Sequence, residues 1–403
     1  MRLIARQRKY SRGAAALFAV LGLSFILPTA VFADDSVGAS TADTTNGAAP
    51  LAGAVSKNAV TATVKNAISS AAAKTSGANV QVKAPTGIAA TSPAAPPMTN
   101  EEVARLIANA HKLHIDRWQD KTKTPRAVVV AVHGTTQHAG SFGVLAQNLA
   151  SQGFIFIGLD LRGHGERFYT AYPGQPNRRV DYDKSADDLG SLLKKVHATY
   201  PKLPVFCIGE SVGAAVTTHC AGRYPGLMDG IILCSPGTRP RNFNPFMVVP
   251  DFVKGVSHLD IPMDVSKYID EYSSDDKRVS DEMISDPLSR IKLTPKEILR
   301  TAFFIRTTPK AAKEVSSDVP VLIVQGEEDG IVSRKSTKAI LKNLPSEHKE
   351  LVEFKDAGHV LLGTSFLKPQ VVNSVSKWLS DQTELQRTKV IGLHNSVKES
   401  QPQ

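Results

Sequence analysis

Cysteine and aromatic side chains are scarce in this chain of 403 residues, which has three Cys and only 6% Phe, Trp and Tyr. Three cysteines cannot all pair, so a small scaffold held together by disulfides is excluded. Cys207 and Cys234 lie within short apolar runs typical of buried strands, and we expect them and Cys220 to be free thiols in the core. Apolar residues make up 42% of the chain, which also excludes a wholly disordered protein.

The chain also lacks blocks of Lys and Arg interleaved with aromatic residues, the pattern typical of nucleic-acid-binding proteins. Its formal net charge is +10. Half of this excess comes from the first 33 residues, which hold no acid and carry five basic residues: Arg2, Arg6, Arg8, Lys9 and Arg12. We therefore expect no nucleic acid as a partner.

Residues 1–33 have the pattern of a secretory signal peptide. The basic start is followed by an apolar stretch at 14–27 and by Val31-Phe32-Ala33 before Asp34, a small-residue cleavage site. The segment has no Arg-Arg pair and no Cys at the cleavage point. This favours general export over twin-arginine export or lipidation. We expect an extracytoplasmic protein, periplasmic or secreted, that begins at Asp34. An uncleaved N-terminal membrane anchor is the alternative.

Residues 34–97 contain no Phe, Tyr, Trp, Met or Cys and consist largely of Ala, Thr, Ser, Gly and Asn. Such a segment buries too little apolar surface to offset its ordering entropy, so we predict a disordered linker. A short helical pattern at 100–110 follows. A single folded domain is expected at 98–381, with a polar C-terminal tail at 382–403.

The central part of the chain alternates between two kinds of segment. Nearly continuous apolar runs, typical of strands covered on both faces, lie at 127–132, 154–159, 205–208, 231–234 and 321–324. Amphipathic stretches of helical length lie at 142–150, 185–200, 212–223 and 335–344. This alternation predicts an α/β fold, with a mostly parallel sheet and helices on both faces. Ligands in such folds bind at the carboxyl ends of the strands.

A candidate nucleophile follows one of these strands, in the sequence Gly209-Glu210-Ser211-Val212-Gly213. A serine held on a sharp turn between strand and helix brings its neighbours so close that they must lack a Cβ. The preceding strand and the following helix are both predicted. We therefore expect Ser211 to be the nucleophile of a hydrolase.

A serine nucleophile needs a base, and the base needs an acid that orients it. The strand at 321–324 leads to Asp329, and the next predicted strand, at 351–354, leads to His359. The order Ser, Asp, His is the one this fold uses. We predict Asp329 as the acid and His359 as the base. Glu328 is an alternative acid, and Asp356 is expected to cap its own loop.

An oxyanion needs hydrogen-bond donors that point at it. We expect one from the backbone N–H of Val212, directly after the nucleophile. The second is expected from the N–H of Thr135, because Gly134 allows the chain after the strand at 127–132 to turn inward. His133 and His138 are expected to shape this loop.

These motifs resemble the monoacylglycerol lipase and lysophospholipase branch of the α/β-hydrolases, which is also grouped with serine-aminopeptidase-like hydrolases. The resemblance covers about 113–379 and rests on His133-Gly134 with His138, Leu159-Asp160-Leu161-Arg162-Gly163-His164-Gly165, Tyr200-Pro201-Lys202-Leu203-Pro204-Val205-Phe206, Gly209 to Gly213, and Gly326-x-x-Asp329 with Gly358-His359. It implies the roles given above for Ser211, Asp329, His359, Thr135 and Val212.

Two positions depart from this family. It usually has Ser two residues after Gly165, where this chain has Arg167, and it commonly has Gly after Gly213, where this chain has Ala214. Asp160 and Arg162 are expected to be structural residues that hold their loop.

An insertion of about 237–318 separates two predicted strands and is expected to form a mainly helical cap. Either it is a mobile cap that admits acyl chains, or it is a packed subdomain. Its apolar residues suited to acyl burial are Phe246, Met247, Val248, Val249, Phe303 and Phe304.

The sequence thus predicts an exported serine hydrolase that cleaves carboxylic esters through an acyl-enzyme. The resemblance implies monoacylglycerols or lysolipids as substrates, with lipid-surface contact left open. No metal cluster or phosphate loop is evident in the sequence, so no cofactor is expected. The alternatives are a serine aminopeptidase, amidase or acyltransferase on the same scaffold, and an inactive tethered binding protein.

Overall fold

The computed structural model describes residues 113–171, 178–238 and 259–399. The signal peptide, the linker, the helical pattern at 100–110 and the apolar run at 246–249 lie outside these ranges. The predictions made for them therefore stay predictions.

The core of the protein is a seven-stranded sheet with the order β1-β3-β2-β4-β5-β8-β9. All neighbouring strands are parallel except β1, which pairs antiparallel with β3 at one edge. The strands are β1 (Ile115–Trp118), β2 (Ala127–Val132), β3 (Phe154–Leu159), β4 (Val205–Glu210), β5 (Gly230–Cys234), β8 (Val321–Gly326) and β9 (Lys349–Phe354). The five strands β2, β3, β4, β5 and β8 are buried along their whole length, as their continuous apolar runs predicted.

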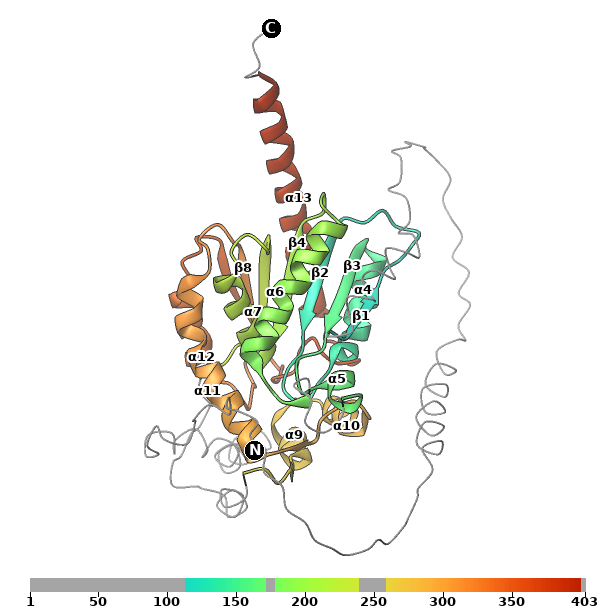
Figure 1. The fold of residues 1–403 in the computed structure, drawn as a ribbon, viewed down its shortest axis with the longest axis vertical. Helices are drawn as coiled ribbons and strands as arrows, with labels where there is room; N and C mark the ends of the chain where they lie inside the picture. The colour runs from blue at the N-terminus through green and yellow to red at the C-terminus, as the bar shows by residue number, and fades with distance from the viewer. Residues whose placement is uncertain (1–112, 172–177, 239–258, 400–403) are drawn as a thin grey trace, which may run out of the picture. The chain divides into compact units, whose positions relative to one another are not determined.

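Helices cover both faces of the sheet (Figure 1). One face carries α6 (Tyr182–Thr199), α7 (Val212–Arg223) and α12 (Arg334–Asn343), and the other carries α4 (Gly143–Ser151) and α13 (Pro369–Glu399). Successive side chains of a strand point to opposite faces. In β2, Val128 and Val130 therefore belong to the first core, whereas Val129 and Ala131 belong to the second. This arrangement confirms the predicted parallel sheet with helices on both faces.

The three cysteines are free and buried, as expected. Cys207 lies on β4, Cys220 on α7 and Cys234 on β5. Burial raises the pKa of all three thiols. They act as small core residues.

The structure places no boundary at residue 381. Helix α13 continues through this point to Glu399, and Thr383 is fully buried. No proline interrupts residues 370–399. Within the described ranges, the protein has no helix that combines the length and the apolar character needed to cross a bilayer.

The insertion between β5 and β8 forms a mainly helical cap, as predicted. Its described elements are β6 (Met263–Asp264), α9 (Ser266–Tyr272), α10 (Lys277–Ser285), β7 (Lys292–Leu293), α11 (Pro295–Ala311) and η5 (Ala312–Glu314). Figure 1 shows α9 and α10 grouped at one end of the sheet, together with α5 (Gly165–Tyr169). The cap has a small apolar core that includes Val265, Met283 and Leu293, and Val360 from the loop after β9 packs into it.

Candidate active site

Ser211 occupies the sharp turn between β4 and α7. Its φ of 57° lies in the left-handed region, which L-residues rarely adopt. A Cβ on Gly209 would lie 2.4 Å from the carbonyl oxygen of Gly213, and a Cβ on Gly213 would lie 2.1 Å from that of Val132. Both positions therefore require glycine, which is the physical reason for the Gly-x-Ser-x-Gly pattern.

The structure brings Ser211, His359 and Asp329 together in one hydrogen-bonded line. Nε2 of His359 lies 2.8 Å from Oγ of Ser211, and Nδ1 of His359 lies 2.8 Å from Oδ2 of Asp329. The three residues come from the ends of β4, β8 and β9. His359 is only 3% exposed and Asp329 only 1%. With Nδ1–H donated to the aspartate, Nε2 is left to accept the serine proton.

Asp329 is held by several donors. Its Oδ1 accepts the backbone N–H groups of Ile331 and Val332, both at 2.8 Å, and its Oδ2 accepts Nε2 of Gln325 at 2.6 Å. These bonds fix the carboxylate in the orientation that His359 needs. The carboxylate bonded to His359 is thus that of Asp329 and not that of the alternative acid Glu328.

The pKa of His359 is raised above its ordinary value of 6.5. Burial alone lowers the pKa, since it disfavours the charged imidazolium. The negative charge and hydrogen bond of Asp329, together with the charge of Glu210, outweigh burial and raise it. The site therefore favours the protonated form that the histidine adopts after it has taken a proton.

Thr135 and Val212, the predicted oxyanion donors, line the same cavity as Ser211 and His359. Val212 begins α7 directly after the serine. A Cβ on Gly134 would lie 3.3 Å from Cβ of Ser211, so the loop after β2 runs close to the nucleophile. The expected surroundings of an oxyanion are thus assembled from two separate loops.

His133 shapes this loop, as expected. Its Nδ1 lies 2.8 Å from the carbonyl oxygen of Gly134, and its Nε2 accepts the backbone N–H of Leu161 at 3.0 Å. Burial, followed by the charge of His164, lowers the pKa of His133 well below its ordinary value. A neutral ring of this kind links two strand-end loops.

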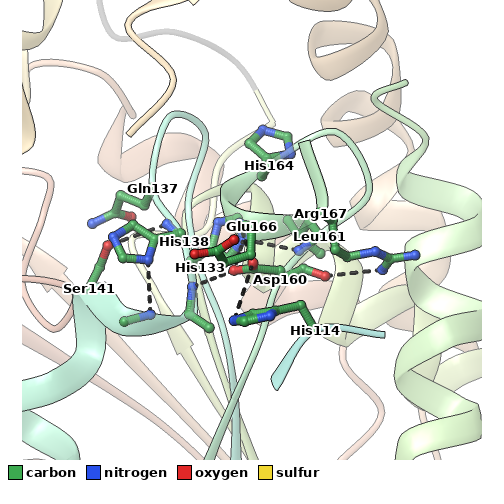
Figure 2. A network of polar contacts seen from close by, with 12 residues as sticks. His114, His133, Gln137, His138, Ser141, Asp160, Leu161, His164, Glu166 and Arg167 are labelled. Atoms are coloured by element: carbon green, nitrogen blue, oxygen red, sulfur yellow. Dashed lines mark hydrogen bonds and ion pairs between the residues drawn. The ribbon is translucent and has the colours of Figure 1, made fainter. Parts of the chain in front are cut away.

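Asp160 is the centre of the polar network shown in Figure 2. It is a structural residue that holds its loop, as expected. Its side chain accepts the backbone N–H groups of Ala139 at 2.7 Å and of Glu166 at 2.8 Å. It is 1% exposed, and burial raises its pKa. Gly165 has a φ of +53°, and a Cβ there would lie 2.4 Å from Oδ2 of Asp160, so glycine is needed for this loop to close.

Arg167 stands where the family usually has serine, and the structure explains how it is accommodated. Its Nη1 donates to the carbonyl oxygen of Asp160 at 3.1 Å, and its Nη2 donates to Oδ2 of Asp188 on α6 at 2.8 Å. Asp188 also accepts two hydrogen bonds from Arg162, from Nε to Oδ2 and from Nη2 to Oδ1, both at 2.8 Å. The sequence alone did not identify Asp188 as the partner of both arginines.

The described part of the cap is bonded to the loop that carries His359. The backbone N–H groups on either side of the histidine, those of Gly358 and Val360, donate to Oδ1 of Asp275 at 2.8 Å and to the carbonyl of Ser273 at 2.9 Å. Both acceptors lie between α9 and α10.

The cap is also bonded to the loop after β2. Nε2 of His138 lies 2.7 Å from Oδ2 of Asp286, and the carbonyl of Thr136 accepts the backbone N–H of Arg290 at 2.8 Å. Burial lowers the pKa of His138, but the hydrogen bond and charge of Asp286 outweigh it and raise the pKa. Of the two expectations for the cap, the packed subdomain is the one that these contacts favour.

A cavity of about 150 Å³ lies beside Ser211 and His359. The strand-end loops form one part of its wall, and the cap forms the rest. The cap side is mainly apolar: Val265, Tyr268, Ile269, Tyr272, Met283, Leu293, Ile298, Ala302 and Ile305.

We expected Phe303 and Phe304 to line this cavity, and that prediction is wrong. Helix α11 presents Ile298, Ala302 and Ile305 to the cavity, and residues three and four apart share one helix face. Phe303 is 38% exposed, and Phe304 stacks on a histidine ring of α7, with the ring centroids 4.5 Å apart. Helix α11 thus has one face toward the cavity and another toward α7. The helical period distinguishes these two faces once α7 is known to be a neighbour of α11.

Comparison with known proteins places this geometry in a family. The family model described as serine aminopeptidase, S33, matches residues 123–365. The monoacylglycerol lipase of Mycolicibacterium smegmatis is 26% identical over 269 residues, which cover 66% of this chain and 91% of the relative. The human monoglyceride lipase is 27% identical over 275 residues, which cover 66% of this chain and 86% of the relative.

Solved structures agree on the fold. The monoacylglycerol lipase of Paleococcus ferrophilus has a TM-score of 0.54 at 21% identity, covering 67% of this chain and 99% of its own. A soluble variant of the Saccharomyces cerevisiae monoglyceride lipase, solved with a substrate analogue, has a TM-score of 0.56 at 21% identity, covering 67% of this chain and 91% of its own. The chain therefore belongs to the serine aminopeptidase S33 family of α/β-hydrolases, on the branch similar to monoacylglycerol lipases, and is a serine ester hydrolase.

Proposed function

We propose that this protein is exported and cleaves the carboxylic ester of monoacyl lipids, such as monoacylglycerols or lysolipids, with Ser211, His359 and Asp329 as its catalytic triad. The observation that carries the proposal is the line of two 2.8 Å hydrogen bonds from Asp329 through His359 to Ser211, beside an apolar cavity. A nucleophile, a base and an orienting acid are the parts that acyl transfer requires.

In the proposed cycle, Oγ of Ser211 attacks the ester carbonyl while Nε2 of His359 takes its proton. The backbone N–H groups of Thr135 and Val212 bind the oxyanion of the tetrahedral intermediate. His359 then gives the proton to the alkoxide as the carbon–oxygen bond breaks, and the alcohol leaves. Water, deprotonated by His359, attacks the acyl-enzyme and releases the fatty acid.

The cavity supports a single acyl chain as the group that is bound. Its cap side consists mainly of Val, Ile, Leu and Met side chains, and each buried CH₂ of a ligand contributes about 0.8 kcal/mol. The two relatives named above are a monoacylglycerol lipase and a monoglyceride lipase, which agrees with this choice.

The aminopeptidase alternative is the less favoured one. An aminopeptidase holds the charged amino group of its substrate, and a buried ammonium needs an anionic partner. Among the described residues that line the cavity, the only ionisable groups other than tyrosine are on His359, and none is Asp or Glu. This wall suits an acyl chain better than an ammonium group.

The test compares substrates and variants of the mature protein. Ser211→Ala and His359→Ala should each lower turnover of monoacylglycerols by several orders of magnitude. Labelling by a fluorophosphonate should be lost in Ser211→Ala, and monoacylglycerols should compete for it in the wild type. Faster release of amino acids from peptides than of any fatty acid in an ester chain-length series would establish the aminopeptidase alternative. Absence of labelling and of turnover would establish an inactive binding protein.

Export is proposed from the sequence of residues 1–33 alone. N-terminal sequencing of the protein from its native host should find Asp34 as the first residue. Met1 on a membrane-bound protein would instead establish the anchor. Deletion of residues 34–97 should leave kcat and KM unchanged, because the composition of this segment buries too little apolar surface to build part of a site.

A further inference from the structure

Glu210, the residue directly before the nucleophile, has a carboxylate that the reaction cycle above does not use. It ends β4 and is fully buried. Its Oε1 accepts the backbone N–H groups of Leu361 at 2.8 Å and Leu362 at 2.9 Å, and its Oε2 accepts that of Gly363 at 2.9 Å. The thiol of Cys234 donates to Oε1 at 3.2 Å. Four donors point at this carboxylate, so both of its oxygens act as hydrogen-bond acceptors.

The three backbone donors belong to successive residues, starting two positions after His359. Successive N–H groups that converge on one anion form a concave nest. A larger residue at the end of this nest would displace these side chains, because a Cβ on Gly363 would lie 2.7 Å from Oε2 of Glu210 and 2.5 Å from Nε2 of Gln137. The loop that carries His359 is therefore wound around the side chain of the residue that precedes Ser211.

The same nest is connected to the loop of the predicted oxyanion donor Thr135. Nε2 of Gln137 donates to the carbonyl oxygen of Gly363 at 2.8 Å, and Oε1 of Gln137 accepts the backbone N–H of Gly134 at 3.0 Å. Glu210, Gly363 and Gln137 thus join the turn of Ser211, the loop of His359 and the loop after β2.

We propose that Glu210 is a positioning residue for acyl transfer: its carboxylate holds the loop of His359 in register with Ser211, and its charge stabilises the imidazolium that forms when His359 takes the serine proton. This inference rests on the proposed triad. A residue with both effects lowers the barrier in two separable ways, through shape and through charge.

The charges around His359 support the second effect. The charges of Asp329 at the end of β8 and of Glu210 at the end of β4 both raise the pKa of the imidazole. From the cap, Asp275 bonds to Gly358 and is paired with Lys368 at 3.0 Å. Cys234 on β5 is neutral, since burial and the charge of Glu210 raise its pKa. Removing the charge of Glu210 therefore removes one of the two negative charges that raise the pKa of His359.

Two substitutions separate shape from charge. Glu210→Gln keeps the length of the side chain and removes its charge, whereas Glu210→Asp keeps the charge and shortens the reach to residues 361–363. Glu282→Gln is the matched control, because Glu282 of α10 also accepts a backbone N–H from this loop, that of Ser365 at 3.0 Å. Its carboxylate belongs to the cap and is not among the charges that shift His359.

The measurement is kcat and kcat/KM as a function of pH with a soluble monoacyl ester. Glu210→Gln should lower kcat about tenfold to a hundredfold, with little change in KM. Its acid limb, the pH range in which the rate rises as His359 loses its proton, should move to lower pH. Glu210→Asp should also lower kcat but keep the acid limb of the wild type. Glu282→Gln should match the wild type in its acid limb.

A purely structural role for Glu210 would give an acid limb in Glu210→Gln that does not move, and this result would overturn the inference. If Glu210→Gln does not fold, Gly363→Ala tests the positioning part, because its Cβ would lie 2.7 Å from Oε2 of Glu210 and would displace the carboxylate. A Gly363→Ala enzyme with the kcat of the wild type would contradict that part. Failure of the triad itself is recognised separately, by full turnover in Ser211→Ala.

Discussion

Asp188 accepts hydrogen bonds from Arg162, in the loop after β3, and from Arg167, on α5. Its removal tests how this chain tolerates Arg167. The Nη2 atom of Arg167 and the Nε atom of Arg162 each lie 2.8 Å from Oδ2 of Asp188. The side chain of Arg167 is only 3% exposed, and that of Asp188 is 13% exposed. Asp188→Ala therefore removes the carboxylate that neutralises a buried guanidinium.

The size of the effect follows from this burial. Removing one partner of a buried ion pair costs about 3–5 kcal/mol, because the other charge stays in the protein without compensation. Each kcal/mol lowers the Tm of a domain of this size by about 2–4 °C, so Asp188→Ala should lower it by roughly 6–20 °C. Arg167→Ser installs the residue that the family usually has and leaves Asp188 paired with Arg162. It should therefore cost less.

Urea denaturation of the two single variants and of the double variant measures the coupling between the residues. The double variant should be more stable than Asp188→Ala alone, since it no longer contains the buried guanidinium of Arg167 that has lost its ion-pair partner Asp188. A loss of less than about 1 kcal/mol in Asp188→Ala would refute the reasoning. So would two losses that simply add in the double variant.

Three further predictions concern the site. The pKa of His359 is raised above 6.5, so its neutral form becomes populated at higher pH than for a free histidine. The value of kcat/KM should therefore rise with pH through a midpoint above 6.5. A profile that is flat from acid to neutral pH would contradict the role of His359 as base. Gly213→Ala should prevent folding or abolish fluorophosphonate labelling, because the new Cβ would lie 2.1 Å from the carbonyl oxygen of Val132; a fully labelled, wild-type-like variant would contradict the elbow geometry. Ala302→Phe should shift the preference of the enzyme toward shorter acyl chains, because Ala302 lines the cavity. The control Phe303→Ala should leave this preference unchanged. The ratio of kcat/KM values across an ester chain-length series measures the preference, and an unchanged ratio in Ala302→Phe would contradict the prediction.

Most of the central strands could be predicted from the sequence. The runs at 127–132 and 154–159 match β2 and β3 residue for residue, because strands buried on both faces are apolar along their whole length. The edge strand β1 was missed: its sequence, IDRW, is half-buried and carries two charges, so it has no such signature. Helix α5 was missed because its five residues are too few for a helical period.

The sequence by itself determined the residues that meet at the site. Ser211 was identifiable because its turn excludes a Cβ at Gly209 and Gly213, which is a local requirement written into five consecutive residues. Asp329 and His359 followed because parallel strands bring their carboxyl ends to one edge of the sheet.

Only the tertiary structure decided what supports and surrounds those residues. The bond between Glu210 and Gly363 spans 153 residues of chain, and no local pattern encodes such a pairing. The placement of Phe304 against α7 rather than in the cavity likewise depended on which of its neighbours α11 meets. Local backbone geometry restricts which residues can stand next to one another in the sequence, so it can be recognised there. Packing and the pairing of buried charges depend on segments that become neighbours only after the chain has folded.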